Sequence, residues 1–331
     1  MKGLVIIMSL AVWMVVTATA VAAPITLKYS HLAPATNNQG RAVQMFADLV
    51  SKNTNGEVKI DVFPANQLGS LPEQFEGVRL GTIDFCMESM DSIYANMESN
   101  WKVCGWAFAF KNIDHLVNYT KSSAYQEAIG RLDKNFNLKV ISINWIRAPF
   151  KVLLFRKQVK NLDEFKGVKI RMPEVASQLK NWAALGANPT PMAFSEVFMA
   201  LKSGIIDSMD CPFDLVYDMK FHTVAPYIML SKHMYQPMAI SASSKKFSGL
   251  DKKYQDILLK ALNEAGEWYS KQGYNDYDKN TQRLKAEGAT IYEIDTSPWR
   301  KRSLDAAVEM EKTGQWPEGT LKRMLFDTEP K

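Results

Sequence analysis

The stretch FKGVKIRMPEVASQLKNWAALGANP, residues 165–189, shows how this chain is built. Residues 168–172 are predicted to form a strand, which is followed at once by Pro173 and a helix over residues 174–185. Gly186 then closes this helix, as glycine commonly does at a helix C-terminus. The stretch is therefore one β-α unit.

The same rhythm runs along much of the chain. Further strands are predicted over 25–29, 58–63, 82–87, 139–145, 151–155 and 205–209, and helices over 39–52, 70–81 and 195–202. Ser70 and Glu73 form a capping box that opens the second of these helices. Repeated β-α units predict an α/β fold with open sheets covered on both faces, and a chain of this length favours two lobes.

Residues 251–287 form the longest segment with helical spacing. They contain no proline, and Gly266 and Gly273 are the weak points. As one helix the segment would be about 55 Å long, at about 1.5 Å per residue, and could brace two lobes. The alternative is two helices broken near Gly273.

Composition excludes several classes of protein. The chain has 331 residues, of which 47% are hydrophobic and 23% charged, and its net charge is +5 without any concentrated basic run. A charge this small and diffuse does not indicate a nucleic-acid partner. Glycine and proline are not in excess, which excludes collagen-like and low-complexity chains.

The N-terminus has the pattern of an export signal. Lys2 precedes an apolar run over 3–16, and small residues follow up to Pro24. Residues 1–22 are therefore predicted to be a cleaved signal peptide, with an uncleaved anchor helix as the alternative. An exported chain exposes its cysteines to an oxidising space, so Cys86, Cys104 and Cys211 could include one disulfide or be three buried thiols.

Motifs for catalysis or metal binding are missing from the sequence. The four histidines are scattered, and neither CxxC nor HExxH occurs. The acidic residues 207, 210 and 214 lack the glycine and terminal glutamate of a calcium loop. Because GxSxG, P-loop and GxGxxG motifs do not occur either, the sequence predicts a binding protein without a cofactor rather than an enzyme.

Arg171 is the candidate binding residue that the residue pattern itself indicates. It stands at the carboxyl end of the predicted strand 168–172, where open α/β sheets bind ligands. A guanidinium offers a fork of donors that matches a carboxylate. The alternative is an arginine on an edge strand that faces water.

Several segments resemble the extracytoplasmic solute-binding proteins of TRAP transporters, the DctP-like family. The matching segments are FKGVKIRMPE at 165–174, ALGANPTPMAFSEVFMALKSGIIDSMD at 184–210, KFHTVAPYIMLSKH at 220–233, EGVRLGTIDF at 76–85 and the opening at 25–70. They occur in the family's order over nearly the whole mature chain.

The resemblance implies a periplasmic-binding-protein-like fold, with a ligand cleft between two lobes and a long helix that spans both. It implies a first lobe over 23–148 plus 237–272 and a second over 149–236 plus 273–331. The implied function is capture of a small organic carboxylate in the periplasm, by lobes that close around it, and delivery to the membrane permease of an ion-gradient-driven transporter. The alternatives are an exported sensor that partners a membrane receptor and an exported α/β enzyme.

The resemblance also implies site residues. Arg171 matches the arginine that pairs with the ligand carboxylate, Lys151 a position that is often a second arginine, and Phe194 an aromatic wall. Cys211 stands where the family usually has asparagine, and Asp210 precedes it. The remaining candidates for the ligand site are Glu76, His31, Trp145 and Met87.

Two departures from the family pattern bear on the ligand. A thiol at Cys211 is a weaker donor than an amide, and Lys151 lacks the guanidinium fork. Both reduce the polar groups available to the ligand. We therefore expect an apolar or aromatic carboxylate, a keto acid or an amino acid rather than a ligand rich in hydroxyl groups.

Overall fold

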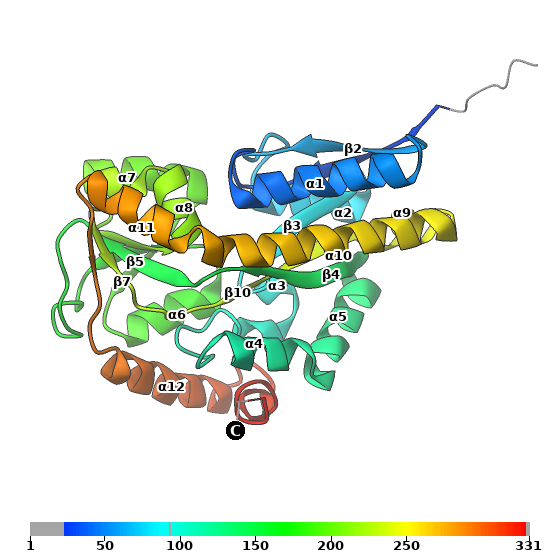
Figure 1. Cartoon of the computed structure of the whole chain (residues 1–331). Coiled ribbons are helices and arrows are strands. Elements are labelled where there is room, and N and C mark those ends of the chain that lie inside the picture. Colours follow the sequence, from blue (N-terminus) through cyan, green and yellow to red (C-terminus); the bar gives the residue numbers. More distant parts are fainter. Residues whose placement is uncertain (1–22, 93, 329–331) are drawn as a thin grey trace, which may run out of the picture.

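A computed structural model describes residues 23–92 and 94–328. Within these ranges the strands form two sheets, one of five strands and one of six, and helices cover both (Figure 1). The predicted signal peptide, residues 1–22, lies outside the described residues. None of the helices in the described part of the chain is long and apolar enough to cross a membrane.

The first sheet has the order β2-β1-β3-β10-β4. Its strands are β1 (Ile25–Ser30), β2 (Val58–Phe63), β3 (Phe85–Ser89), β4 (Leu138–Arg147) and β10 (Gln236–Ser243). β1 runs parallel to β2 and β3, whereas β10 is antiparallel to β3 and β4. The chain thus returns to this sheet late, and β10 lies between β3 and β4.

The second sheet has the order β11-β9-β5-β8-β6-β7. Its strands are β5 (Lys151–Phe155), β6 (Lys169–Met172), β7 (Asn188–Pro191), β8 (Ser208–Pro212), β9 (Tyr227–Met229) and β11 (Thr290–Tyr292). The strand predicted over 205–209 is therefore placed three residues too early. Ile205 is 61% exposed in the turn before β8, while Asp210 and Cys211 continue the strand because β5 pairs with them.

Helices and short helical turns connect these strands. The helices are α1 (Asn38–Asn53), α2 (Leu71–Leu80), α3 (Tyr94–Met97), α4 (Ile113–Thr120), α5 (Ser123–Phe136), α6 (Ala176–Ala184), α7 (Val197–Ser203), α8 (Phe213–Asp218), α9 (Ser244–Ser248), α10 (Lys252–Asn275), α11 (Tyr277–Ala286) and α12 (Ser297–Lys312), with tighter or wider turns η1 (Ser99–Lys102), η2 (Phe194–Glu196), η3 (Phe221–Thr223) and η4 (Lys322–Phe326). The capping box at Ser70 and the left-handed Gly81 confirm the predicted ends of α2. α7 begins two residues later than the predicted helix 195–202 and ends at the left-handed Gly204.

The long helix lies along both lobes, as the sequence predicted, but it has one interruption. α10 runs beside the first sheet and packs on α1 and β4, and α11 continues toward the second sheet after the single residue Asp276 (Figure 1). Gly273 stays inside α10. Its hydrogen atom faces Ala148, and a Cβ there would lie 2.4 Å from the Ala148 carbonyl oxygen, so this glycine permits close packing rather than a break.

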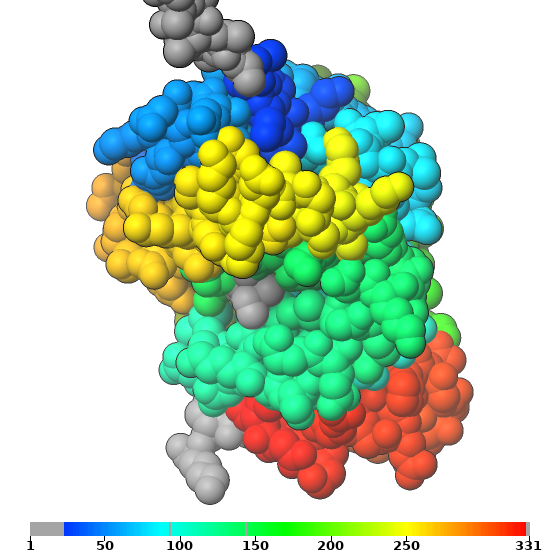
Figure 2. All heavy atoms as spheres, turned by 90° about the vertical axis from the view of Figure 1, so that its right-hand side faces the viewer, coloured from blue at the N-terminus to red at the C-terminus, as the bar shows by residue number. Residues whose placement is uncertain are grey.

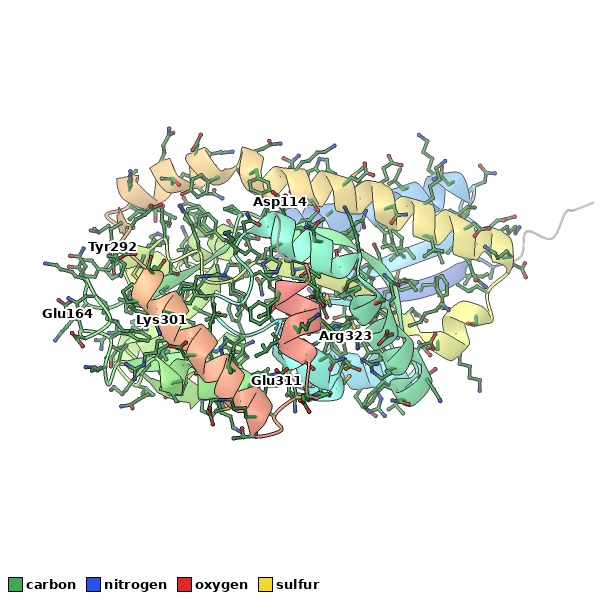
Figure 3. All side chains as sticks on the ribbon, turned by 90° about the horizontal axis from the view of Figure 1, so that it is seen from below. Asp114, Glu164, Tyr292, Lys301, Glu311 and Arg323 are labelled. Carbon is green, nitrogen blue, oxygen red and sulfur yellow. The ribbon has the colours of Figure 1, made fainter. Side chains whose placement is uncertain are left out.

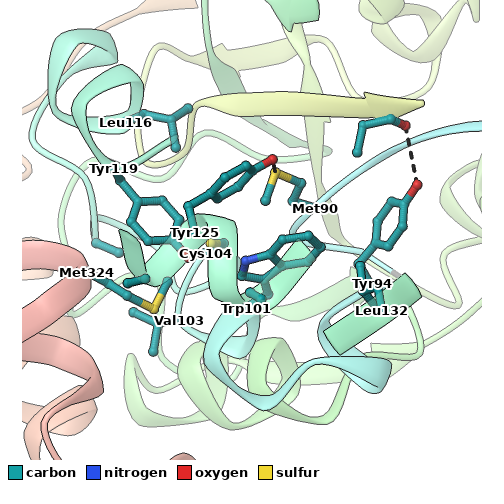
Figure 4. Close-up of a cluster of buried hydrophobic side chains, with 14 of the residues drawn as sticks. Met90, Tyr94, Trp101, Val103, Cys104, Leu116, Tyr119, Tyr125, Leu132 and Met324 are labelled. Atoms are coloured by element: carbon teal, nitrogen blue, oxygen red, sulfur yellow. Dashed lines mark hydrogen bonds between the residues drawn. The ribbon is translucent and has the colours of Figure 1, made fainter. Parts of the chain in front are cut away.

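A second apolar core lies on the other face of the first sheet. Figure 4 shows it around Trp101, which stacks on Tyr125 with ring centroids 5.4 Å apart. The C-terminal turn η4 contributes Met324 and Leu325 to this core. Figure 2 shows these C-terminal residues at the end of the molecule opposite α1.

The last two helical segments, α12 and η4, contact both lobes. Trp299 of α12 packs in the core of the second sheet, where its ring centre lies 4.5 Å from that of Phe165. The turn η4 packs in the core of the first sheet. Figure 3 shows α12 and η4 lying across this face, with Lys301 and Arg323 labelled on them. Residues 273–331, which the resemblance assigned to the second lobe, therefore contact both.

All three cysteines are free and buried. Burial raises the pKa of the thiols of Cys86, Cys104 and Cys211 well above the ordinary value, so they are held as neutral, apolar side chains. Of the two alternatives that the sequence left open, the structure has the buried thiols.

Candidate functional site

Charged side chains from both lobes meet where β3, β4, β5, β6 and β8 approach one another. Three cations, Arg147, Lys151 and Arg171, and four carboxyl groups, Glu88, Asp91, Asp210 and Asp214, are all at least nine-tenths buried there. We call these seven residues the charged cluster. Buried charges are costly unless they are paired, so a concentration of this kind between two lobes indicates a site for a polar ligand.

Arg171 is the cation of the charged cluster that lacks an anionic partner. Its Nε and Nη2 both donate to the carbonyl oxygen of Met192, at 2.9 and 2.7 Å, and its guanidinium lies 5.5 Å from the ring centre of Phe194. Among the described residues, no carboxylate lies within ion-pairing distance of it. Burial lowers the pKa of this guanidinium, although Asp210 acts in the opposite direction.

Lys151, by contrast, is already neutralised. Its Nζ donates to Oδ2 of Asp210 at 2.7 Å and to Oδ2 of Asp91 at 3.2 Å. Burial alone lowers the pKa of this ammonium, but the two carboxylates outweigh burial and hold the pKa above its usual value. Lys151 therefore forms a compensated charge group with Asp91 and Asp210 inside the charged cluster.

Asp210 is the counterpart of Lys151. Burial alone raises the pKa of its carboxyl group, but the Lys151 ammonium and the nearby His233 imidazole outweigh burial and hold that pKa below its usual range. His233 lies 3.7 Å from Asp210 through Nε2, and its Nδ1 is 2.7 Å from the Ser231 hydroxyl. Asp210 is therefore a fixed negative charge, with its hydrogen-bonding capacity used inside the protein.

Arg147, at the end of β4, was not predicted. It donates through Nε to the Tyr269 hydroxyl at 3.0 Å and through Nη2 to Oε1 of Gln39. The carboxylate of Asp214, from the second lobe, lies 3.7 Å from its Nε. Arg147 therefore links α1, α10 and α8 around one buried charge.

Glu88, at the end of β3, was also not predicted. Its Oε1 accepts a hydrogen bond from the backbone amide of Ser89 at 2.8 Å, and its Oε2 is buried without a partner. Burial raises the pKa of this carboxyl group to about 7, although Arg147 acts in the opposite direction. Glu88 is thus partly protonated near neutral pH.

Several polar atoms around Arg147 are buried and unpartnered. Both ring nitrogens of His31, Nε2 of Gln39 and Oδ1 of Asp214 make no hydrogen bond to the described residues. Burial, together with the Arg147 charge, lowers the pKa of His31 to about 4, so its imidazole is neutral. These atoms supply donors and acceptors at one end of the charged cluster.

The other predicted residues divide into three groups. Phe194 lies beside Arg171, and its role as an aromatic wall of the ligand site stays a prediction. Cys211 follows Asp210 on β8, but its side chain packs with Val152 and Met209 in the core of the second sheet. Met87 and Trp145 belong to the core between the first sheet and α10, where Trp145 packs against Tyr269.

Glu76 lies away from the charged cluster. It is exposed on α2, where it forms an ion pair with Arg79 at 2.8 Å, three residues along the same helix. Helical spacing explains this pair, which is a common surface arrangement.

A signal for the missed residues is present in the sequence. Arg147 is followed by Ala148-Pro149 and Arg171 by Met172-Pro173, so both arginines stand two residues before a proline, at or next to the end of a strand. Glu88 and Asp91 similarly follow the predicted strand 82–87. The strand-end argument used for Arg171 applies equally to these residues.

Comparison with known proteins shows the family and the fold of this chain. The model of the bacterial extracellular solute-binding protein family 7, DctP, matches residues 29–313. The chain therefore belongs to this family of solute-binding proteins, whose members act in transport and are not enzymes.

Two curated relatives are periplasmic binding proteins. The 2,3-diketo-L-gulonate-binding periplasmic protein YiaO of Escherichia coli is 29% identical over 266 residues, or 80% of each chain. The C4-dicarboxylate-binding periplasmic protein DctP of Rhodobacter capsulatus is 26% identical over 273 residues, 82% of this chain and 81% of that one. These relatives support a periplasmic location.

Solved structures share the fold. A sugar acid binding protein from Advenella mimigardefordensis in complex with galactonate superposes with a TM-score of 0.86 at 22% identity, covering 92% of this chain and 98% of that one. A TRAP periplasmic solute-binding protein from Polaromonas with bound D-erythronate has a TM-score of 0.83 at 24% identity and the same coverage. The two-lobed fold predicted from the sequence is thereby confirmed.

Proposed function

We propose that this protein captures a small organic carboxylate in the periplasm and delivers it to the membrane permease of a TRAP transporter. Arg171 carries the proposal, because it is a buried guanidinium with no carboxylate partner among the described residues. The permease partner and the carboxylate follow from the family, and Arg171 is the group on this chain that would hold the carboxylate.

The surroundings of Arg171 suit a ligand carboxylate. Its two bonds to Met192 fix the plane of the guanidinium, and Nη1 makes no hydrogen bond to the described residues. An anion that reaches this side chain pairs with it in a medium of low dielectric, where Coulomb attraction is stronger than in water. Closure of the lobes is stabilised only to the extent that the ligand binds the closed state better.

Lys151 does not add a second carboxylate-binding cation, since Asp91 and Asp210 already surround it. We therefore propose that one ligand carboxylate is bound, at Arg171. The apolar or aromatic body expected from the sequence stays a prediction. The sugar acids bound by proteins of the same fold offer the competing expectation.

Isothermal titration calorimetry with acids tests this function. The titrants are L-galactonate, D-erythronate, pantoate and D-glucuronate, together with apolar acids of the same carbon number. Removing one partner of a buried charge pair costs about 3–5 kcal/mol, so Arg171→Ala is expected to weaken binding of the preferred acid by about two to three decades.

The matched control is Arg323→Ala. Arg323 is an exposed arginine of η4 that pairs with Glu127, and its replacement is expected to leave the affinity unchanged. Equal affinities of wild type and Arg171→Ala would refute the role of Arg171. Recovery of a chemically changed acid after incubation would favour the enzymatic alternative.

A further inference from the structure

β2 is an edge strand whose outer side is open. It stands at the end of the strand order of the first sheet, and within residues 23–92 and 94–328 it pairs with β1 alone. Figure 1 shows β2 along the top of the molecule, with α1 between it and α10. The chain after β2 turns back toward β1, because the Ala65 amide donates to the Ala33 carbonyl oxygen at 3.0 Å. An open edge presents unpaired backbone groups that another strand can bind.

The backbone groups on the open side belong to the even-numbered residues of β2. The odd-numbered residues face β1, since the Phe63 carbonyl oxygen accepts a hydrogen bond from the His31 amide. Backbone groups of successive strand residues point to opposite sides, and the Val58 amide accordingly donates to the Thr54 hydroxyl, at 3.1 Å, rather than to β1. The amide and carbonyl groups of Ile60, in the middle of β2, are therefore directed at the open edge.

The side chains of β2 carry opposite charges in a self-complementary order. Lys59 and Asp61 are exposed on the face of the strand away from α1, and neither forms an ion pair with a described residue. Two antiparallel copies of β2 centred on Ile60 would place Lys59 of each copy opposite Asp61 of the other. These two positions exchange no backbone hydrogen bonds across the pair, so their side chains approach most closely, and opposite charges there attract.

The same charges disfavour the neighbouring registers. A shift of two residues in one direction sets the two Asp61 carboxylates opposite each other, and a shift in the other direction does the same to the two Lys59 ammonium groups. A shift of a single residue would set the backbone groups of Ile60 against those of Asp61, which already face β1. The order of residues in β2 therefore favours one antiparallel register.

An apolar groove adjoins the open edge. Its volume is about 500 Å³, and it is lined by Met45 and Leu49 of α1 and by Val62 and Pro64 at the end of β2. A two-fold axis through Ile60, perpendicular to the sheet, would keep α1 of both copies on the same face of a joined sheet. Met45 and Leu49 are half-buried, so association along this edge would remove more of their apolar surface from water.

We propose that the open edge of β2 binds a second copy of this chain in the antiparallel register centred on Ile60, so that the two first sheets form one continuous sheet. The contact is isologous, because each copy contributes the same strand and the same groove. None of the seven residues of the charged cluster belongs to β2 or α1, so the pair leaves both clusters in place. The proposal therefore does not depend on the proposed function.

Sedimentation equilibrium of the mature chain over about a hundredfold range of concentration tests the pairing. The average mass is expected to rise toward twice that of the monomer. Lys59→Asp sets a carboxylate opposite Asp61 of the other copy, so it is expected to weaken association by about tenfold or more. The charge-reversed double variant, Lys59→Asp with Asp61→Lys, restores the attraction and is expected to associate within about threefold of wild type.

The matched control is Lys285→Asp, which reverses the charge of an exposed lysine of α11 and is expected to leave association unchanged. Hydrogen exchange gives a second readout. The Ile60 amide is expected to exchange more slowly in concentrated than in dilute wild type, and equally fast at both concentrations in Lys59→Asp. Circular dichroism checks that each variant is folded, and the exposure of Lys59 and Asp61 favours this.

The other outcomes overturn the proposal. One is a wild-type chain that stays monomeric, with an Ile60 amide that exchanges equally fast at all concentrations. Another is a dimer that Lys59→Asp leaves unchanged, since it would use a different surface, or one that the charge-reversed double variant fails to restore, since it would use a different register. Slow exchange of Ile60 in a monomeric chain, seen only with vesicles that contain the permease, would assign the edge to the permease instead of a second copy.

Discussion

The Nζ of Lys151 lies 3.2 Å from Oδ2 of Asp91, and this ion pair joins the two lobes. Asp91 follows the last residue of β3 in the first sheet, and Lys151 begins β5 in the second. Gln178 of α6 strengthens the same junction, because its Nε2 donates to the Asp91 carbonyl oxygen at 2.6 Å. The turn after β3 is therefore held by side chains of the second lobe.

Replacement of Lys151 tests the energetic role of this junction. Lys151→Met would leave Asp91 and Asp210 buried without their shared cation, so the free energy of unfolding is expected to fall by about 3–5 kcal/mol. Urea denaturation followed by tryptophan fluorescence measures the change. Lys157→Met, at an exposed lysine just after β5, is the control and is expected to lie within about 0.5 kcal/mol of wild type. A stable Lys151→Met protein would mean that the cluster is hydrated rather than dry.

Two asparagines at the start of α1 donate to carboxylates of distant segments, Asp218 of α8 and Asp276 between α10 and α11. Nδ2 of Asn38 donates to Asp276 at 2.9 Å, and Nδ2 of Asn37 donates to Asp218 at 2.6 Å. Asn37 also caps α1 through the Gln39 amide, so Asn38 is the cleaner site for substitution.

Asn38→Ala is expected to speed ligand dissociation by about threefold to tenfold, because a hydrogen bond to a charged group contributes about 1.5–3 kcal/mol and only part of it is lost on opening. Stopped-flow fluorescence measures the rate with the acid that calorimetry identifies. Asn188→Ala removes an exposed asparagine that bonds within its own lobe and serves as control. An unchanged dissociation rate would show that this contact does not hold the lobes together.

Glu88 is expected to make stability depend on pH. Its pKa is about 7 in the folded chain against 4.5 ordinarily, so the folded state binds the extra proton between these values. Proton binding at Glu88 therefore adds at most about 3 kcal/mol to the free energy of unfolding. This contribution is fully present below about pH 4.5 and is lost as pH rises through 7. The difference in unfolding free energy between wild type and Glu88→Gln, followed by urea titration from pH 5 to 8, should therefore change in this direction. A flat difference would contradict the raised pKa.

His31 is expected to act in the opposite sense. The pKa of His31 falls from 6.5 to about 4 on folding. Its contribution to the free energy of unfolding is therefore present above pH 6.5 and is lost as pH falls through 4. His31→Gln should therefore reduce the acid sensitivity of the chain between these values. Thermal unfolding of both proteins at pH 7 and pH 4.5 provides the comparison, and an equal loss of melting temperature in both would exclude His31 as the cause.

Two glycines in helices provide a matched pair of stability tests. A Cβ at Gly266 in α10 would lie 2.6 Å from the Trp145 ring, whereas nothing lies within 4 Å of a Cβ at Gly130 in α5. Gly266→Ala is expected to lower the free energy of unfolding by about 1–3 kcal/mol, because the added methyl group overpacks against β4. Gly130→Ala is expected to raise it by about 0.5–1 kcal/mol, because alanine has the higher helix propensity. Denaturation curves of both variants measure the contrast, which would vanish if α10 could shift freely on the sheet.

Local patterns in the sequence predicted most of the framework. The capping box at Ser70, the glycine after α2 and the alternation over β2 act within a few residues, so they are legible without the rest of the chain. The prediction started both β3 and β8 three residues too early. At β8, Asp210 and Cys211 are strand residues only because β5 pairs with them. Local polarity cannot reveal a pairing between segments more than fifty residues apart.

The candidate site was predicted only in part, for the same reason. Arg171 and Phe194, two of the predicted residues, lie together because β6 pairs with β7 and Phe194 begins the turn η2 just after β7. Glu88 and Arg147 belong to the other sheet, and their proximity to Arg171 depends on how the lobes meet. No spacing along the chain encodes that arrangement.

The family, the β-α rhythm, the long helix and the arginine proposed to bind a carboxylate can be inferred from the amino-acid sequence, since each depends on short-range patterns or on ordered motifs. Which cation is left without a carboxylate partner depends on the folded chain. Lys151 and Arg171 are both cations near strand ends, but two carboxylates from different parts of the chain neutralise the first and leave the second without an anion. Charge compensation in a buried site depends on distances of a few ångströms between remote segments, and folding alone sets those distances.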